Sequence, residues 1–148
     1  MRNFLITIGA AILGQLVAYL IIQVGPYVIP PPNGMDISTH HGLYAAWPDV
    51  EPKHFFMLFL GNAFGSFLAA TLISRFTTRR ILSRTLLVGL LYLFIGIYHA
   101  NVDPAPWWFK VSDVCIAYLP MTILGYFFGI VLRPEKKSKC PILSYGIF

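Results

Sequence analysis

Four long apolar runs alternate with polar segments along the chain, at residues 4–24, 55–73, 82–98 and 107–132. Each run approaches or exceeds the roughly 20 residues with which a helix crosses about 30 Å of hydrocarbon. Barrel strands would alternate with period two, which these runs do not, and a lone strand cannot satisfy its own backbone in lipid. The pattern therefore predicts an all-α membrane protein, a four-helix transmembrane bundle that forms one integral membrane domain over residues 1–148.

A secretory signal peptide is the main alternative for the first run, because Arg2 precedes it. The run covers 21 residues (4–24), whereas the apolar core of a signal peptide has about 7–15. No small-x-small cleavage site closes it. We interpret this run as an uncleaved first helix.

Cations mark one side of the predicted bundle. Eight of the eleven Lys and Arg residues precede the first run, lie between the second and third, or follow the fourth, and Arg84 lies at the start of the third; Lys53 and Lys110 are the exceptions. Lys and Arg beside a span are retained in the cytoplasm. Both termini are therefore predicted to be cytoplasmic, with an outer loop at residues 25–54 and a cytoplasmic tail at residues 133–148.

Composition supports a lipid environment, since 57% of residues are hydrophobic and the mean hydropathy is +0.68. A soluble domain of 148 residues could not bury that much apolar surface. The net charge is +5, but the cations lie beside the membrane and accompany no nucleic-acid-binding motif. We expect the lipid bilayer as a partner and no nucleic acid.

Small residues recur every four positions in two of the runs, which is typical of faces where helices pack closely. They are Gly61, Gly65 and Ala69 in the second run and Gly125 and Gly129 in the fourth; Ala10, Gly14 and Ala18 form a weaker set in the first. This spacing predicts helix-packing seams. It leaves open whether the seams join helices of one chain, two copies in a homo-oligomer, or another membrane protein.

Polar side chains inside the runs are candidates for interhelical hydrogen bonds or for a pathway lining. Asn62 and Ser66 flank the stripe in the second run, Gln15 lies in the first, and Tyr92 in the third. An interhelical hydrogen bond is the simpler interpretation of Asn62 and Gln15.

The segment "YHANVDPAPWWFKVSDVC" holds a histidine and two aspartates. His99 ends a helical face that includes Tyr92, and Asp113 lies about 9 Å below Trp107, at the edge of the hydrocarbon. His99 and Asp113 are the candidate catalytic pair, as a proton relay or as general acid and base. The alternative is that Asp113 bonds to Lys110, a tyrosine or water, and Asp103 is interpreted as a loop residue.

The outer loop carries three histidines without metal-binding spacing, so neither a metal nor a cofactor is predicted; they are His40, His41 and His54. Instead of a metal site, we expect a solvated loop with a short interfacial helix that includes Leu43 and Tyr44. Cys115 and Cys140 lie at different levels and are interpreted as plain thiols.

Four short motifs are distributed over nearly the whole chain: "NGMD" after the first run, "GNAFGSFLAA" in the second, "PAPWWF" at the start of the fourth and "LPMTILG" within it. In this order they resemble an uncharacterised family of small four-helix bacterial inner-membrane proteins. The resemblance implies a bacterial inner-membrane location and this topology, and it transfers no catalytic residue.

Three functions fit these features. The leading hypothesis is a structural or accessory protein that associates through its small-residue faces. The alternative is a small transporter or channel subunit acting as an oligomer, which requires Gln15, Asn62 and Tyr92 to converge on one lumen. A membrane enzyme is the third, and it requires His99 and Asp113 within hydrogen-bond reach, directly or through one water, beside a pocket.

Overall fold

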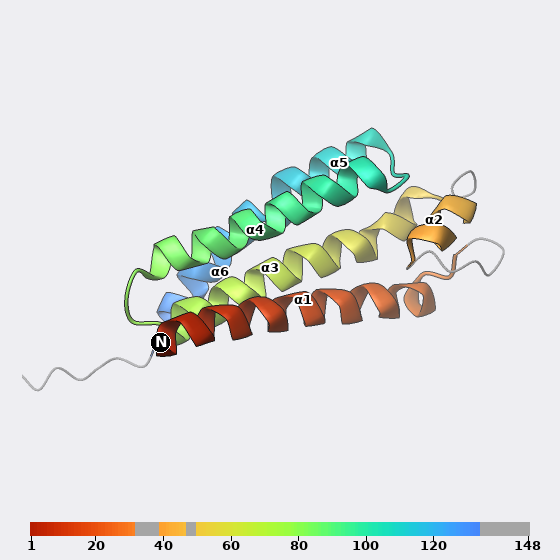
Figure 1. Cartoon of the computed structure of the whole chain (residues 1–148). Coiled ribbons are helices and arrows are strands. Elements are labelled where there is room, and N and C mark those ends of the chain that lie inside the picture. Colours follow the sequence, from red (N-terminus) through yellow and green to blue (C-terminus); the bar gives the residue numbers. More distant parts are fainter. Residues whose placement is uncertain (32–38, 47–49, 134–148) are drawn as a thin grey trace, which may run out of the picture.

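The computed structural model describes residues 1–31, 39–46 and 50–133, and every regular element in those ranges is helical (Figure 1). The elements are α1 (Arg2–Val28), α2 (His40–Ala46), η3 (Pro52–His54), α3 (Phe55–Phe76), α4 (Ile81–Val102), α5 (Trp107–Ser112), the π-helical turn η4 (Asp113–Ala117) and α6 (Leu119–Val131). The predicted tail after Arg133, including Cys140, and the "NGMD" motif lie outside the described residues.

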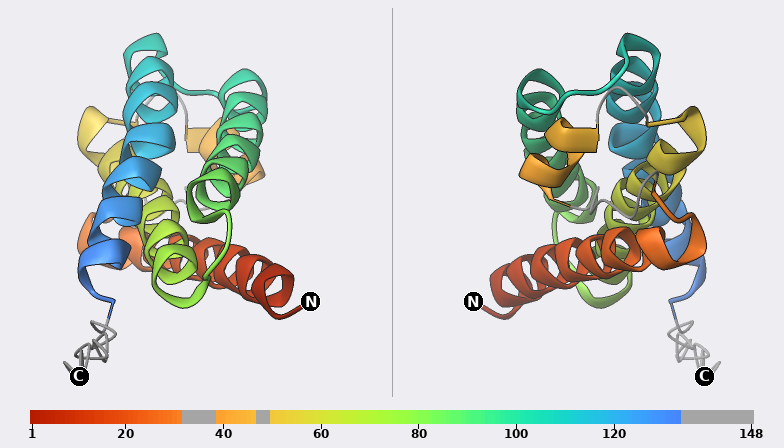
Figure 2. Two further views of the ribbon diagram at one scale, coloured as in Figure 1. Left: turned by 90° about the vertical axis from the view of Figure 1, so that its left-hand side faces the viewer. Right: turned by 90° about the vertical axis from the view of Figure 1, so that its right-hand side faces the viewer.

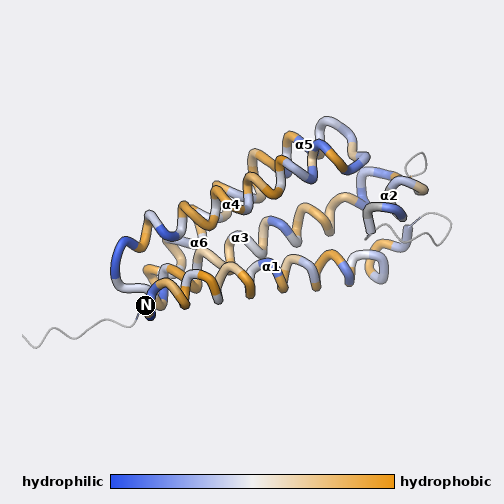
Figure 3. The backbone as a smooth tube through the Cα atoms, viewed as in Figure 1, coloured by the Kyte–Doolittle hydropathy of each residue, from blue (hydrophilic) through white to orange (hydrophobic). Residues whose placement is uncertain are grey.

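Within the described ranges, four helical segments are long and apolar enough to cross a membrane: Arg2–Val28, Pro52–Phe76, Ile81–Val102 and Trp107–Val131. Hydrophobic residues follow all four along their length (Figure 3). Many of the large ones are exposed, for example Leu16, Leu91 and Phe127. Such a surface suits lipid rather than water. The prediction of an all-helical chain with four membrane-length helices is confirmed.

The first helix is longer than predicted, whereas the predicted outer loop contains the short helix that was expected. Helix α1 continues to Val28, past the predicted end at residue 24, and includes Pro26 near its end. The outer loop holds the expected short helix, which includes Leu43 and Tyr44.

Helix α3 is the centre of the bundle, with α1 packed along one face and α6 along another. The contact with α1 brings backbones together at Gly14 and Gly65. A Cβ atom added to Gly65 would lie 2.7 Å from the carbonyl oxygen of Gly14 and 2.8 Å from Cβ of Ala18. One added to Gly14 would lie 2.6 Å from the carbonyl oxygen of Gly65. Only glycine permits this approach.

The second seam joins α6 to α3. An added Cβ at Gly129 would lie 2.6 Å from Cβ of Ser74, and one at Gly125 would lie 2.9 Å from Cβ of Ala70. Thr71 links the same two helices, since its hydroxyl donates to the carbonyl oxygens of Phe67 and Gly125 at 2.8 Å and 3.3 Å.

Both small-residue stripes are therefore occupied by helices of the same chain. Gly61, Gly65 and Ala69 face the stripe of Ala10, Gly14 and Ala18, while Gly125 and Gly129 face the other side of α3. The leading hypothesis assigned these stripes to association with other molecules. The packing instead uses the close backbone approach to build the bundle, so that hypothesis loses the surface on which it relied.

Arginines fasten the end of the bundle where the chain begins. Arg133 donates to the carbonyl oxygens of Ser74 and Thr77, and Arg75 donates to that of Leu132. Arg84 donates to the carbonyl oxygen of Asn3 at 3.2 Å. Cations near helix C-termini satisfy carbonyls that have no partner within the helix.

Helices α1 and α4 diverge from this end. Their hydrogen bonds, from Arg84 to Asn3 and Thr7 and from Tyr92 to Ala11, all lie in the first part of α1. Beyond them the two helices separate toward the end that carries α2, as both Figure 1 and the end-on views of Figure 2 show. Helices α1 and α4 therefore form a wedge that widens toward the α2 end, and α3 packs against both of them.

The α1–α3 seam predicts a sharp difference between two glycines. Gly65→Ala should lower stability by about 1–3 kcal/mol, because the added methyl group overpacks a backbone contact. Gly9→Ala is the matched control, since an added Cβ there meets nothing within 4 Å. Unfolding of both variants by sodium dodecyl sulfate in mixed micelles measures this. Equal stability of the two variants would contradict the seam.

Candidate functional site

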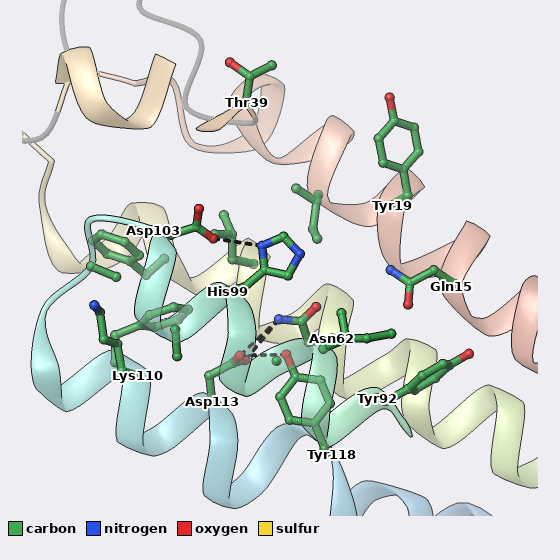
Figure 4. Close-up of a pocket in the computed structure, with 18 residues that line it drawn as sticks. Gln15, Tyr19, Thr39, Asn62, Tyr92, His99, Asp103, Lys110, Asp113 and Tyr118 are labelled. Atoms are coloured by element: carbon green, nitrogen blue, oxygen red, sulfur yellow. Dashed lines mark hydrogen bonds and ion pairs between the residues drawn. The ribbon is translucent and has the colours of Figure 1, made fainter. Parts of the chain in front are cut away.

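A cavity of about 290 Å³ lies in the wedge between α1 and α4 (Figure 4). This volume is near the lower end of the ~300–1,000 Å³ range of small-molecule sites. Its exposed lining residues Tyr19, Ile95 and His99 place its opening between α1 and α4. All four membrane-length segments contribute polar side chains, namely Gln15, Asn62, Tyr92, His99, Asp113 and Tyr118.

Asp113 is the buried charge of the cavity, with 7% of its surface exposed. Nδ2 of Asn62 donates to both carboxylate oxygens, at 3.2 Å and 3.1 Å. The hydroxyl of Tyr118 donates to Oδ2 at 2.9 Å. Of the alternatives predicted for Asp113, the bond to a tyrosine is therefore the one present, and Asn62 makes the expected interhelical hydrogen bond.

The π-helical turn explains how Asp113 and Tyr118 meet. In a regular α-helix residues five apart differ by about 140° in direction, because each residue turns the chain by about 100°. The turn η4 spans Asp113–Ala117 and closes hydrogen bonds over five residues instead of four. This widening brings Tyr118 back to the side of Asp113. Pro120 follows directly, in the first turn of α6.

His99 and Asp103 form a second pair at the mouth of the cavity. His99 Nδ1 lies 3.1 Å from Asp103 Oδ2, and their side chains are 61% and 26% exposed. Asp103 directly follows the end of α4, in the loop where it was predicted, and it also pairs with His99, a contact that the sequence did not predict. The third helix runs to Val102, past its predicted end at residue 98, so Asp103 lies within about one helical turn of His99.

The predicted catalytic pair is brought to one cavity without a direct hydrogen bond. His99 bonds to Asp103, while Asp113 bonds to Asn62 and Tyr118. The enzyme hypothesis required the two side chains to be within hydrogen-bond reach, directly or through one water, and the direct bond is not among the contacts of the described residues. His99 lies at the mouth of the cavity, and Asp113 lies inside it.

Gln15, Asn62 and Tyr92 converge as the transporter hypothesis required, since all three line this cavity. Tyr92 is buried and donates its hydroxyl hydrogen to the carbonyl oxygen of Ala11, which closes the narrow end of the wedge. Ser66 is not part of the lining; its hydroxyl donates to the carbonyl oxygen of Asn62 at 2.8 Å.

The wide end of the wedge is covered by α2. The hydroxyl of Tyr44 donates to the carbonyl oxygen of Val102 at 3.2 Å, which ties α2 to the end of α4. Thr39, directly before α2, is part of the cavity lining. Helix α2 thus lies over the wide end of the cavity.

His54, the last residue of the predicted outer loop, has a structural role. His54 is buried, with Nδ1 3.1 Å from the backbone nitrogen of Glu51 and Nε2 3.0 Å from the carbonyl oxygen of Pro30. It thereby joins the start of α3 to the end of α1. Next to it Lys53, 2.9 Å from Glu51, lowers the pKa of the Glu51 carboxyl. Within the described ranges, no three His, Cys, Asp or Glu side chains are placed to hold one metal ion.

Tyr118 is the cavity residue that sequence reasoning missed. It lies five residues after Asp113, a spacing that an α-helical period places on a different face. The nearby Pro120 was the available signal, because a proline marks a point where helix geometry departs from regular.

Comparison of the chain with protein-family models, with curated proteins and with solved structures found no match. The resemblance to a family of bacterial inner-membrane proteins therefore stays a prediction. The site has to be interpreted from its own geometry.

The Asn62–Asp113 contact predicts a stability difference between neighbouring polar residues of α3. Asn62→Leu should cost about 1–3 kcal/mol, because it leaves a buried carboxylate without two of its hydrogen bonds. Ser66→Ala should cost no more than about 0.6 kcal/mol, since it removes only a bond within its own helix. Unfolding in mixed micelles checks both. If Asn62→Leu were as stable as the wild type, Asp113 would not depend on this contact.

Proposed function

We propose that this multi-pass membrane protein binds a small amphipathic molecule in the cavity between α1 and α4. The observation that carries the proposal is the buried carboxylate of Asp113 inside a cavity that combines polar side chains with apolar ones such as Leu58 and Phe109. A ligand with one polar end and one apolar part matches that lining.

The cost of the carboxylate supports a binding role. An ionisable group within a membrane-spanning segment is expensive and usually marks a functional site. Asn62 and Tyr118 donate the hydrogen bonds that Asp113 accepts, and both of these side chains are neutral. A carboxylate in this position retains the capacity to attract a further polar group.

The open side of the wedge supports access from lipid. Tyr19 and Ile95 line the cavity and are also exposed on the outer surface of the bundle. In a membrane this surface meets acyl chains. A molecule dissolved in the bilayer could enter sideways with its apolar part still in lipid.

A small transporter is the second candidate, favoured by the convergence of Gln15, Asn62 and Tyr92. It requires the narrow end to open as well. That end is held by the bond from Tyr92 to Ala11 and by the close contact of Gly14 with Gly65. Binding needs no such opening, and we therefore place it first.

We further propose that the protein lies in a bacterial inner membrane with both termini in the cytoplasm. The arginines of the α3–α4 turn and Arg133 lie at the end of the bundle where α1 begins, in agreement with the positive-inside rule. This orientation would set the cavity in the outer half of the bilayer.

Orientation is tested with alkaline phosphatase, which is active only outside the cytoplasm, fused after selected positions. Fusions after residues 78 and 148 should be inactive, whereas one after residue 104 should be active, because cations flank the first two positions. Immunoblots control for expression. The reverse activity pattern would overturn the proposed orientation.

Ligand entry is tested by alkylation of an introduced cysteine. In a background with Cys115→Ser and Cys140→Ser, Ala100→Cys places a thiol on the cavity lining. Alkylation of this thiol by a membrane-permeant iodoacetamide at neutral pH, where the protonated amines do not consume the reagent, should slow several-fold when short-chain amphiphiles such as hexylamine and hexanol occupy the cavity.

Leu91→Cys is the matched control, because Leu91 lies on the same helix, is 52% exposed and is outside the cavity lining. Its alkylation should not change. Equal slowing at both positions would indicate a general membrane effect, and no slowing at position 100 with any of the compounds would contradict the proposed function.

A further inference from the structure

We infer that the polar end of the ligand is a primary ammonium group, bound by Asp113 together with the side-chain oxygens of Asn62 and Tyr118. This inference deepens the proposed function and rests on it. It concerns the chemical class of the ligand. The cavity could bind a ligand of another class, so this inference can fail while the proposed function holds.

The hydrogen-bond directions around Asp113 make the inner part of the cavity rich in acceptors. Both hydrogen bonds of Asn62 Nδ2 end on the carboxylate, and the hydroxyl hydrogen of Tyr118 is directed to the same group. Tyr92 uses its hydroxyl hydrogen on the carbonyl oxygen of Ala11. What remains for a ligand are oxygen lone pairs: those of the carboxylate, of Asn62 Oδ1 and of the two phenols.

The charges along the cavity vary with depth. His99 and Asp103 pair with each other at the mouth. Lys110 precedes Asp113 by three residues, about one helical turn, and points away from it in Figure 4. Asp113, deeper than these three, contacts neutral donors only. The inner part of the cavity therefore favours a cation over an anion.

A primary ammonium group fits these acceptors best. It carries three donor hydrogens, as the lysine side chain does, and can bond at once to the carboxylate, Asn62 Oδ1 and the Tyr118 oxygen. A quaternary ammonium group has the charge without any donor, and an alcohol has a single donor without the charge. The cavity volume of about 290 Å³ limits the attached apolar body to a short one.

The test compares hexylamine with hexanol in lipid nanodiscs, by the rate of alkylation at Ala100→Cys in the cysteine-free background. Concentrations are expressed per lipid, so that membrane partition does not enter the comparison. Hexylamine should protect the thiol at roughly tenfold or more lower concentration than hexanol, because charge-assisted hydrogen bonds are the stronger ones.

Asp113→Asn should remove this preference, so that hexylamine and hexanol protect equally. Asp103→Asn is the matched control, since it makes the same change of charge at the mouth, and there the preference should persist. Equal protection by the two compounds in the unsubstituted cavity would overturn the ammonium inference and leave ligand binding intact. Absence of protection by either compound would instead count against the proposed function.

A second series keeps the ammonium inference testable even if Asp113→Asn does not fold. With the Asp113 side chain intact, hexylamine is replaced by its N-methyl, N,N-dimethyl and N,N,N-trimethyl forms, which retain the charge and lose donors stepwise. Protection should fall along the series. Equal protection by all four amines would show that the cavity selects for charge alone, and it would overturn the assignment of a primary ammonium group.

Discussion

The fold depends on the close approach of backbones along two faces of α3. Helices in lipid gain little from the hydrophobic effect, so van der Waals contact between small residues supplies much of their association. Gly14 and Gly65 provide that contact toward α1, and Gly125 and Gly129 provide it toward α6. With both neighbours fixed on α3, helix α4 meets α1 only near the chain start, and the wedge between them follows from this arrangement.

The wedge gives chemical meaning to the few polar residues of the membrane segments. Asp113 would be a costly group on a lipid-facing surface, but in the wedge it is buried beside Asn62 and Tyr118. The π-helical turn that positions Tyr118 is a departure from regular helix geometry at the site itself. Such turns occur frequently at functional sites. Structure and proposed function thus depend on the same features. The glycine contacts of α3 hold α1 and α6 in place beside the wedge, and the π-helical turn places Tyr118 next to Asp113 inside it.

The sequence predicts most of the fold and part of the site. Apolar run length determines the four helices, and residue spacing identifies Gly65 and Gly125 as seam residues, because both signals are local. Which helix meets which seam depends on the whole bundle, so the sequence left open whether these seams join helices of one chain, and in the structure they do. Asn62 and Asp113 were recognised as unusual polar residues, whereas the contribution of Tyr118 requires the π-helical turn, which periodicity does not reveal.

Disulfide crosslinking in native membranes tests most directly whether the α1–α3 seam lies within one chain. Ala10→Cys and Ala69→Cys, both in the buried core, are combined in a background without Cys115 and Cys140, with a protease site engineered between α1 and α2. We expect a disulfide that holds the two proteolytic fragments of a single chain together. A crosslinked product with twice the mass of the chain, and fragments that separate after cleavage of the monomer, would contradict it.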